Sequence, residues 1–200
     1  MSLTLRYMQL LDIAQVVAID QQSFNPPWSA RSYEYEIRES HYSHMVVLEQ
    51  ADSPPSLSLV QRWFGNGAKT AHRIVAYGGL WNIADEAHIS TIASHPQMRG
   101  RGLGEVVLAG MIAKAIHNRA AYVVLEVRVS NTSAQNLYHK YAFTIVDTKK
   151  GYYHNNGEDA YDMRLNLTDP QTVSAFQARH AALRQRVPHI DQYSTAERMR

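Results

Sequence analysis

Two features of this sequence could do chemistry. The first is a turn rich in glycine and arginine, residues 99–104 (RGRGLG), which stands directly before a helical pattern. Glycines let a backbone turn sharply and approach a ligand closely, and the free N–H groups at a helix start bind anions. The second is a pair of groups that could move protons, Glu126 within an apolar segment and Tyr138 twelve residues later. Together they predict a site that binds an anionic ligand and transfers protons.

The elements that must position these groups follow from hydrophobic patterning. Strands are expected at residues 74–80 and 87–92 before the turn, then an amphipathic helix, a strand at 122–129 of the kind buried on both faces, and a helix at 131–141. The remaining expected elements are a strand at 3–8, a helical stripe at 11–19, a helix at 30–39 after the N-cap Ser29, and strands at 45–48, 144–148 and 159–167. The order βααβββαβαββ predicts a mixed α/β domain.

Composition limits the class of protein. The 200 residues are 45% hydrophobic and 19% charged, which suits one folded domain rather than a disordered chain. No apolar run reaches the roughly 18 residues of a membrane span, and no secretory signal is evident at the start. The absence of cysteine excludes disulfides and a cysteine nucleophile. We therefore expect a cytoplasmic protein without membrane contact, and a net charge of +2 favours no specific binding of nucleic acid.

The turn does not fit two other nucleotide-binding motifs, and the histidines do not fit a metal site. A dinucleotide fingerprint would follow the first strand of a βαβ unit, and a Walker A loop would need Gly-Lys-Ser/Thr. The ten histidines contain no HxH or HxxxH pair, so no metal is expected. A turn that merely reverses the chain remains the alternative to an anion site.

Glu126 and Tyr138 each have a structural alternative. Glu126 could face a cleft, or it could pair with Arg128, which lies two residues along and on the same face of a strand. Tyr138 could be a buried ring of the core, since tyrosines near a helix C-terminus usually bury a large apolar area. The sequence alone leaves both alternatives open.

The pattern Arg99-x-x-Gly102-x-Gly104 resembles the acetyl-CoA pyrophosphate loop of the Gcn5-related N-acetyltransferase (GNAT) superfamily. Further matches, in order and spacing, are similar to the ribosomal-protein alanine N-acetyltransferase (RimI) group over residues 3–167. They are Pro27-Trp28-Ser29, the segments 125–128 and 130–131, Ala134, Leu137-Tyr138, Phe143, Tyr152-Tyr153, residues 158–160 and Met163. The resemblance implies a GNAT fold, with a central, mostly antiparallel mixed sheet flanked by helices and splayed at the acetyl-CoA site.

The resemblance also implies roles for individual residues. Glu126 would be the general base, and Tyr138 the general acid that protonates the CoA thiolate. Acetyl-CoA would bind the backbone of Ile92, Ala93 and Ser94, the turn Arg99, Gly100, Arg101, Gly102, Leu103 and Gly104, and the N-cap Asn131, with amides of Met98 and Leu103 on the pyrophosphate. No metal is required.

The acceptor side is predicted at two loops that carry exposed aromatic residues, Phe24 and Trp28 in one, Tyr152 and Tyr153 in the other. Such loops suit an extended peptide. The alternatives are a core anchor for Trp28 and an ordinary hairpin flank for the tyrosines.

Two segments and two local replacements depart from the family pattern. Residues 51–71 form an inserted loop that includes Trp63 and Phe64 and could cover part of the acceptor cleft or be a tolerated surface excursion. Residues 168–200 form a tail that we expect to dock as a helix on the domain of residues 1–167, the alternatives being dimerisation and contact with an acidic partner such as ribosomal RNA. Ser94-His95 replaces the more usual Val and Asp. Ala142 replaces a glycine, at little cost if φ there is negative.

We therefore expect direct transfer of an acetyl group, in a ternary complex, to the N-terminal α-amine of a protein or peptide, with a ribosomal protein among the candidates. The first alternative is the same chemistry on a lysine, a polyamine or another small amine. The second is a non-catalytic acyl-CoA-binding module, which would not need both Glu126 and Tyr138. The oligomeric state is left open.

Overall fold

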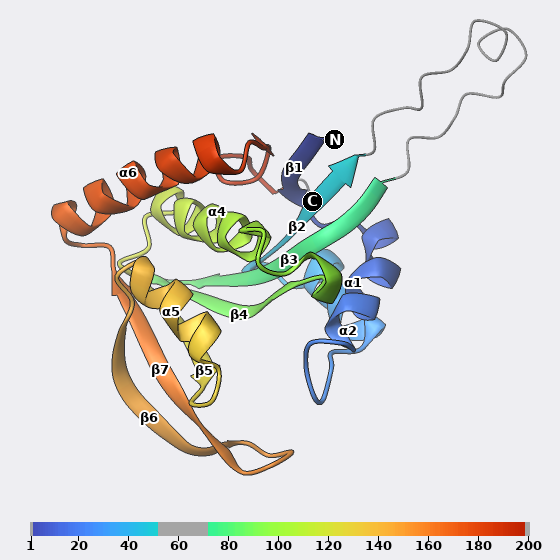
Figure 1. The fold of residues 1–200 in the computed structure, drawn as a ribbon, viewed down its shortest axis with the longest axis horizontal. Helices are drawn as coiled ribbons and strands as arrows, with labels where there is room; N and C mark the ends of the chain where they lie inside the picture. Colours follow the sequence, from blue (N-terminus) through green and yellow to red (C-terminus); the bar gives the residue numbers. More distant parts are fainter. Residues whose placement is uncertain (1, 52–71, 199–200) are drawn as a thin grey trace, which may run out of the picture.

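The computed structural model describes residues 2–51 and 72–198. They form one mixed α/β unit around an eight-stranded sheet, in the order β6-β7-β5-β4-β3-β2-β1-β8 (Figure 1). Apart from Ala51, the predicted inserted loop lies outside the described residues, and so do Trp63 and Phe64. No helix within the two described ranges is long and apolar enough to cross a membrane.

The elements lie close to their predicted positions. The strands are β1 Ser2–Tyr7, β2 Ser43–Ala51, β3 His72–Ile83, β4 Glu86–Ser94, β5 Tyr122–Arg128, β6 Thr144–Tyr153, β7 Glu158–Asn166 and β8 Ile190–Asp191. The helices are α1 Ile13–Asp20, α2 Ala30–Arg38, α4 Leu103–His117, α5 Thr132–Lys140 and α6 Pro170–Arg186, with 3-10 turns η1 Leu10–Asp12 and η2 Pro96–Met98. Among the strands of the described residues, only β1 with β8 and β4 with β5 pair in parallel, which confirms a mixed, mostly antiparallel sheet.

The sheet opens between β4 and β5. Their parallel pairing runs from Glu86 opposite Tyr122 to His88 opposite Val124 and stops there. Beyond that point β4 stays paired with β3, and β5 stays paired with β7. Figure 1 shows β5, β6 and β7 turning away from the rest of the sheet. The predicted splay is therefore confirmed, and it leaves two facing strand edges unpaired with each other.

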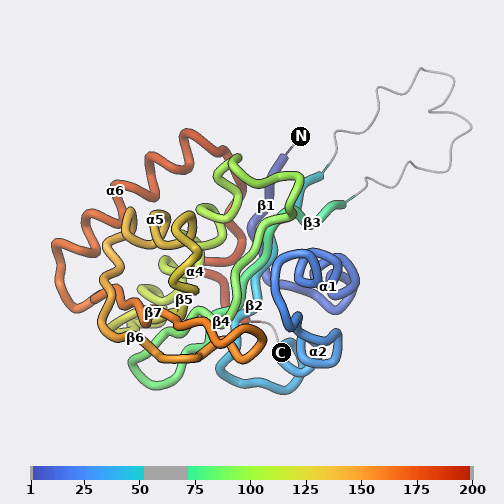
Figure 2. Tube along the Cα trace, turned by 60° about the horizontal axis from the view of Figure 1, so that its bottom comes forward, coloured from blue at the N-terminus to red at the C-terminus, as the bar shows by residue number. Residues whose placement is uncertain are grey.

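The two faces of the sheet are covered by different helices (Figure 2). One core packs α4 and α6 against the sheet, and its buried side chains include Val107, Met111 and Leu183. The other core packs α1 and α2 against the opposite face, and its buried side chains include Val16, Ile19, Tyr33 and Tyr77. Burial of these apolar side chains fixes each helix on its face, because every fully buried Leu, Ile or Val contributes about 1.5–3 kcal/mol.

Local signals set the helix ends. The Ser29 hydroxyl accepts a hydrogen bond from the Ser32 amide, and the Asn131 side chain accepts one from the Ala134 amide, so both predicted N-caps are confirmed. The condition under which Ala142 would cost little is not met, because its φ is +64°. Ala142 occupies the left-handed position of a Schellman motif, in which amides 142 and 143 donate to the carbonyls of His139 and Tyr138.

The C-terminal segment packs on the rest of the chain. Phe176 and Leu183 of α6 are buried in the same core as α4, and Tyr193 is fully buried. Arg186 of α6 forms an ion pair with Glu105 of α4 at 2.5 Å. The expected docking of a C-terminal helix on its own domain is confirmed.

Candidate functional site

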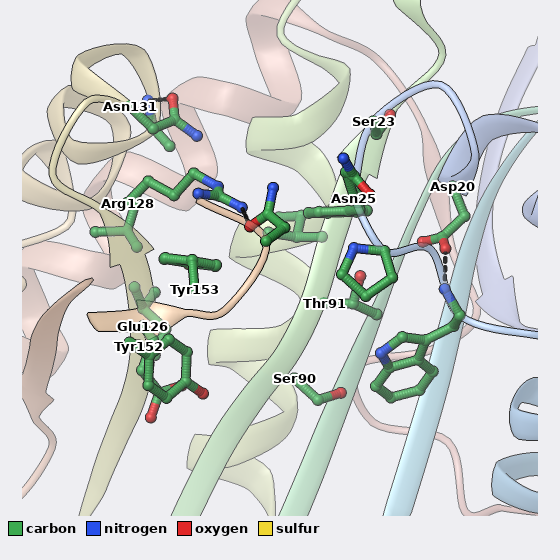
Figure 3. A pocket seen from close by; sticks show the side chains of 18 of the residues that line it. Asp20, Ser23, Asn25, Ser90, Thr91, Glu126, Arg128, Asn131, Tyr152 and Tyr153 are labelled. Carbon is green, nitrogen blue, oxygen red and sulfur yellow. Dashed lines mark hydrogen bonds between the residues drawn. The ribbon is translucent and has the colours of Figure 1, made fainter. Parts of the chain in front are cut away.

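A cavity of about 730 Å³ opens where β4 and β5 separate. Its walls come from the end of α1 and the loop after it, from β4 and β5, from the start of α5 and from the loop between β6 and β7. In Figure 3, Glu126, Tyr152 and Tyr153 lie on one side of the cavity, and Asp20, Asn25 and Thr91 lie on the other. The two predicted acceptor loops thus face each other across the gap in the sheet.

Glu126 lines this cavity and is bound by side chains from two other strands, β4 and β6. Its Oε2 lies 2.8 Å from His88 Nε2 on β4, and its Oε1 accepts from Lys149 Nζ on β6 at 2.5 Å. Burial raises the pKa of this carboxyl, but the hydrogen bonds and charges of His88 and Lys149 outweigh burial and lower the pKa to about 2. Glu126 is therefore a carboxylate at neutral pH. The alternative pairing with Arg128 is wrong.

Arg128 instead organises the loop between β6 and β7. Its guanidinium donates to Glu158 at 2.8 Å and to the side-chain oxygens of Asn155 and Asn156 at 2.9 and 3.1 Å. It also lies over the ring of Tyr153, 3.7 Å from the ring centre. These contacts shape the wall of the cavity that carries Tyr152 and Tyr153.

Tyr138 of α5 lines the same cavity and is 6% exposed. Its ring is buried in the core beneath α4 and contacts Phe143, so the alternative that Tyr138 is a buried core residue is correct for the ring. Its hydroxyl makes no hydrogen bond with any other residue of the described ranges. Burial raises its pKa above the usual value, so the hydroxyl keeps its proton at neutral pH. A phenol that is protonated and without a partner is available as a proton donor.

The glycine turn lies beside the cavity rather than in its lining. Gly100 and Gly102 have φ of +76° and +78°, which is the left-handed conformation that favours glycine. Within the described residues, the amides of 100–105 donate no hydrogen bond, which leaves a row of free donors at the start of α4. The expected role of the Met98 amide is wrong, because this amide donates to the His95 carbonyl at 2.8 Å.

The other predicted cofactor residues lie in the cavity, in the core beside it or next to the glycine turn. Ile92 and Asn131 line the cavity, whereas the side chain of Ala93 packs into the core beneath α1 and α2. Ser94 lies next to the turn, with its hydroxyl 3.0 Å from where a Cβ on Gly104 would stand. Arg99 and Arg101 are exposed, and Arg99 donates to the Ser23 hydroxyl at 3.2 Å.

All four predicted acceptor residues, Phe24, Trp28, Tyr152 and Tyr153, line the cavity. Phe24 and Tyr152 are 40% and 42% exposed, as expected of contact surfaces. Trp28 lines the cavity and also packs in the interior, since its ring stacks on that of Trp81 with the ring centres 6.2 Å apart.

Three residues that contact the candidate site were not predicted from the sequence. His88 and Lys149 bind Glu126, and buried Asp20 accepts the Trp28 amide hydrogen at 2.5 Å. Only the sheet brings His88, Lys149 and Glu126 together, because they lie on β4, β6 and β5. A histidine or lysine in a strand carries no local signal of such a contact.

The chain matches the model of the acetyltransferase (GNAT) family over residues 13–143. It is 34% identical over 164 residues to a Bacillus subtilis protein that is named, provisionally, as a [ribosomal protein bS18]-alanine N-acetyltransferase, and the match covers 82% of this chain and 95% of that protein.

Two solved structures share the fold. The ribosomal-protein-S18-alanine N-acetyltransferase of Escherichia coli superposes with a TM-score of 0.65 at 25% identity, covering 82% of this chain and 94% of that one. The NatC complex bound to Gag peptide and CoA contains a chain that superposes at 0.64 with 18% identity, covering 84% and 99%. The family model and the named relative identify an acetyl-CoA-dependent N-acetyltransferase rather than a non-catalytic module. The chain belongs to the acetyltransferase (GNAT) family.

Proposed function

We propose that this enzyme transfers the acetyl group of acetyl-CoA to the N-terminal α-amine of a protein. One observation carries the proposal: Glu126 and Tyr138 line one cavity at the opening of the sheet, which two aromatic loops border. The names of the similar proteins support an α-amine acceptor and make a ribosomal protein the first acceptor to try. We assign this activity to residues 1–167 and place the enzyme in the cytoplasm.

The free amides at the start of α4 would bind the pyrophosphate of acetyl-CoA. The positive φ of Gly100 and Gly102 lets the backbone turn sharply before α4, and the helix dipole adds to the attraction for an anion. Arg99 and Arg101 would add charge at the same place. The backbone of residues 92–94, which no longer pairs with β5, and Asn131 would contact the pantetheine.

Glu126 would accept the proton that the acceptor amine must lose. A peptide α-amine has a pKa near 8, so a weak base is sufficient, whereas a lysine amine near 10.4 needs a stronger one. With its pKa near 2, the Glu126 carboxylate is a weak base and would accept the proton through a water molecule. His88 and Lys149 would hold the carboxylate in place.

Tyr138 would supply the second proton. In a direct transfer the amine nitrogen forms a bond to the acetyl carbon, the carbon–sulfur bond breaks, and the thiolate takes the proton of the Tyr138 hydroxyl. The proton lost by the amine leaves through Glu126, so the transfer balances without a covalent enzyme intermediate. The unpartnered, protonated hydroxyl of Tyr138 suits this role.

The charges in the cavity favour a peptide over a polyamine. Glu126 is paired with His88 and Lys149, and Glu158 is paired with Arg128. A polycationic acceptor needs accessible carboxylates without partners, and neither of these glutamates is unpaired. The third carboxylate of the lining, Asp20, is 1% exposed and already accepts three hydrogen bonds. The exposed aromatic rings of Phe24 and Tyr152 instead suit contacts with an extended peptide.

The test is a thiol-release assay with acetyl-CoA and short peptides. The panel contains free N-termini, including Ala-Arg starts, together with N-terminally blocked peptides that contain lysine and with spermidine. We expect turnover only with free N-termini. Turnover confined to lysine peptides or spermidine would contradict the proposed acceptor, and no turnover with any amine would contradict the proposed activity.

A further inference from the structure

The loop of residues 21–27, between α1 and α2, forms one wall of the cavity and carries Phe24. Both ends of this loop are bound to a single residue, Asp20. At the start, the Asp20 carbonyl accepts from the amides of Ser23 and Phe24, each at 2.9 Å. At the end, the Asp20 carboxylate accepts from the Trp28 amide at 2.5 Å, the contact drawn as a dashed line in Figure 3.

The carboxylate of Asp20 is buried, with 1% of the residue exposed. Its other oxygen accepts from the hydroxyls of Tyr33 on α2, at 2.9 Å, and of Tyr77 on β3. All three of these donors are uncharged. A carboxylate is costly to bury without a cation, and donated hydrogen bonds offset that cost. The loop, both helices and the sheet are thus joined at one carboxylate.

The ring of Trp28 is fixed separately from its backbone. It stacks on Trp81, whose indole N–H donates to Glu36 at 3.0 Å. Loss of the Asp20 carboxylate would therefore release the end of the loop while the Trp28 ring keeps its stacking partner. The expected consequence is a displaced loop in a folded protein.

We propose that Asp20 is a positioning residue for the acceptor: it binds both ends of the loop 21–27 and so sets the shape of the wall that the acceptor peptide contacts. This inference rests on the proposed function, because it requires an acceptor that occupies this cavity. Asp20 acts through the loop and not on the reacting atoms. Its loss should weaken acceptor binding much more than it affects acetyl-CoA binding or the transfer step.

The experiment compares Asp20→Ala, Asp20→Asn and the control Tyr33→Phe with the unmodified enzyme on a peptide with a free α-amine. We expect Asp20→Ala to raise the KM for the peptide about tenfold or more, with kcat within about threefold and acetyl-CoA affinity within about twofold. Asp20→Asn should recover most of the loss, because an amide oxygen can still accept from the Trp28 amide. Tyr33→Phe keeps that contact and should keep the KM of the unmodified enzyme.

Two results would overturn the inference. One is an unchanged peptide KM in Asp20→Ala, and the other is a loss of kcat and acetyl-CoA affinity as large as the loss in KM. Should Asp20→Ala fail to fold, hydrogen exchange of the unmodified enzyme decides. The Trp28 amide should exchange about tenfold or more slowly than the Asn25 amide, which makes no hydrogen bond within the described residues, and equal rates would contradict the inference. Absence of peptide turnover in the unmodified enzyme would instead count against the proposed function.

Discussion

Removing the hydroxyl from each of two buried tyrosines at the end of α5, Tyr138 and Tyr141, should have opposite effects on activity and stability. Tyr138 and Tyr141 are 6% and 2% exposed, and burial raises both pKa values, so they are chemically alike. They differ in their partners: the Tyr141 hydroxyl donates to Glu105 at 2.9 Å, whereas the Tyr138 hydroxyl has no partner in the described ranges and lines the cavity. Tyr138→Phe should therefore remove function, and Tyr141→Phe should remove stability.

The magnitudes follow from these contacts. Phenylalanine at 138 keeps the ring in the core and removes a hydroxyl that makes no hydrogen bond to the described residues, so the free energy of unfolding should change by less than about 1 kcal/mol. Loss of a general acid should lower kcat about 10²–10⁴-fold. Tyr141→Phe breaks a hydrogen bond to a carboxylate that Lys140 and Arg186 still pair with, so it should cost about 1–2 kcal/mol and leave kcat within about twofold.

The assays are urea unfolding and steady-state thiol release on the two variants and the unmodified enzyme. The expected pattern is a stable, inactive Tyr138→Phe and a less stable, active Tyr141→Phe. The reasoning would be refuted by a Tyr138→Phe variant with the kcat of the unmodified enzyme. It would also be refuted by one that loses as much stability as Tyr141→Phe, since the hydroxyl would then have a structural partner.

Three further predictions concern Glu126 and Ala142. Glu126→Gln should lower kcat about 10²–10⁴-fold, measured by thiol release, while acetyl-CoA affinity stays within about twofold; an equal loss in both would indicate a structural role instead. The pKa of Glu126 in the folded protein, about 2, lies below its unfolded value, so the stability that this ionised carboxylate contributes is present above about pH 4.5 and is lost as pH falls toward 2. Lys149→Met should lower the free energy of unfolding by about 1–2 kcal/mol at pH 7 and should make that free energy, measured by urea unfolding, fall less steeply at acid pH. The control Lys150→Met, at an exposed site, should have neither effect. Ala142→Gly should raise the free energy of unfolding by about 0.5–1 kcal/mol, seen as a Tm about 1–4 °C higher, because glycine adopts the φ of +64° without strain; an unchanged or lower Tm would contradict this.

Features that depend on local sequence were predictable. The caps Ser29 and Asn131 and the glycine turn before α4 each depend on a few neighbouring residues, and the structure has them where the sequence placed them. Ala142 shows the limit of local reasoning. Its left-handed φ comes from the Schellman motif that ends α5. A glycine at this position would have indicated the motif in the sequence, whereas an alanine does not.

Features that depend on strand pairing were not predictable. Spacing along β5 left open whether Glu126 faces a cleft or pairs with Arg128, and the partners of Glu126 come instead from β4 and β6. The sheet order places those strands on either side of β5, with β7 between β5 and β6, and a single sequence does not reveal that order. The contacts of Asp20 were not predictable for the same reason, since its partner Tyr77 lies on β3, far from Asp20 in the sequence.

The central claim is that the acceptor is an α-amine, activated by Glu126. The most direct test incubates the enzyme and acetyl-CoA with one peptide that carries both a free N-terminus and an internal lysine, and locates the added acetyl group by tandem mass spectrometry. We expect the acetyl group on the N-terminal nitrogen alone, with little product from Glu126→Gln. An acetyl group on the lysine side chain, or undiminished N-terminal product from Glu126→Gln, would contradict the account.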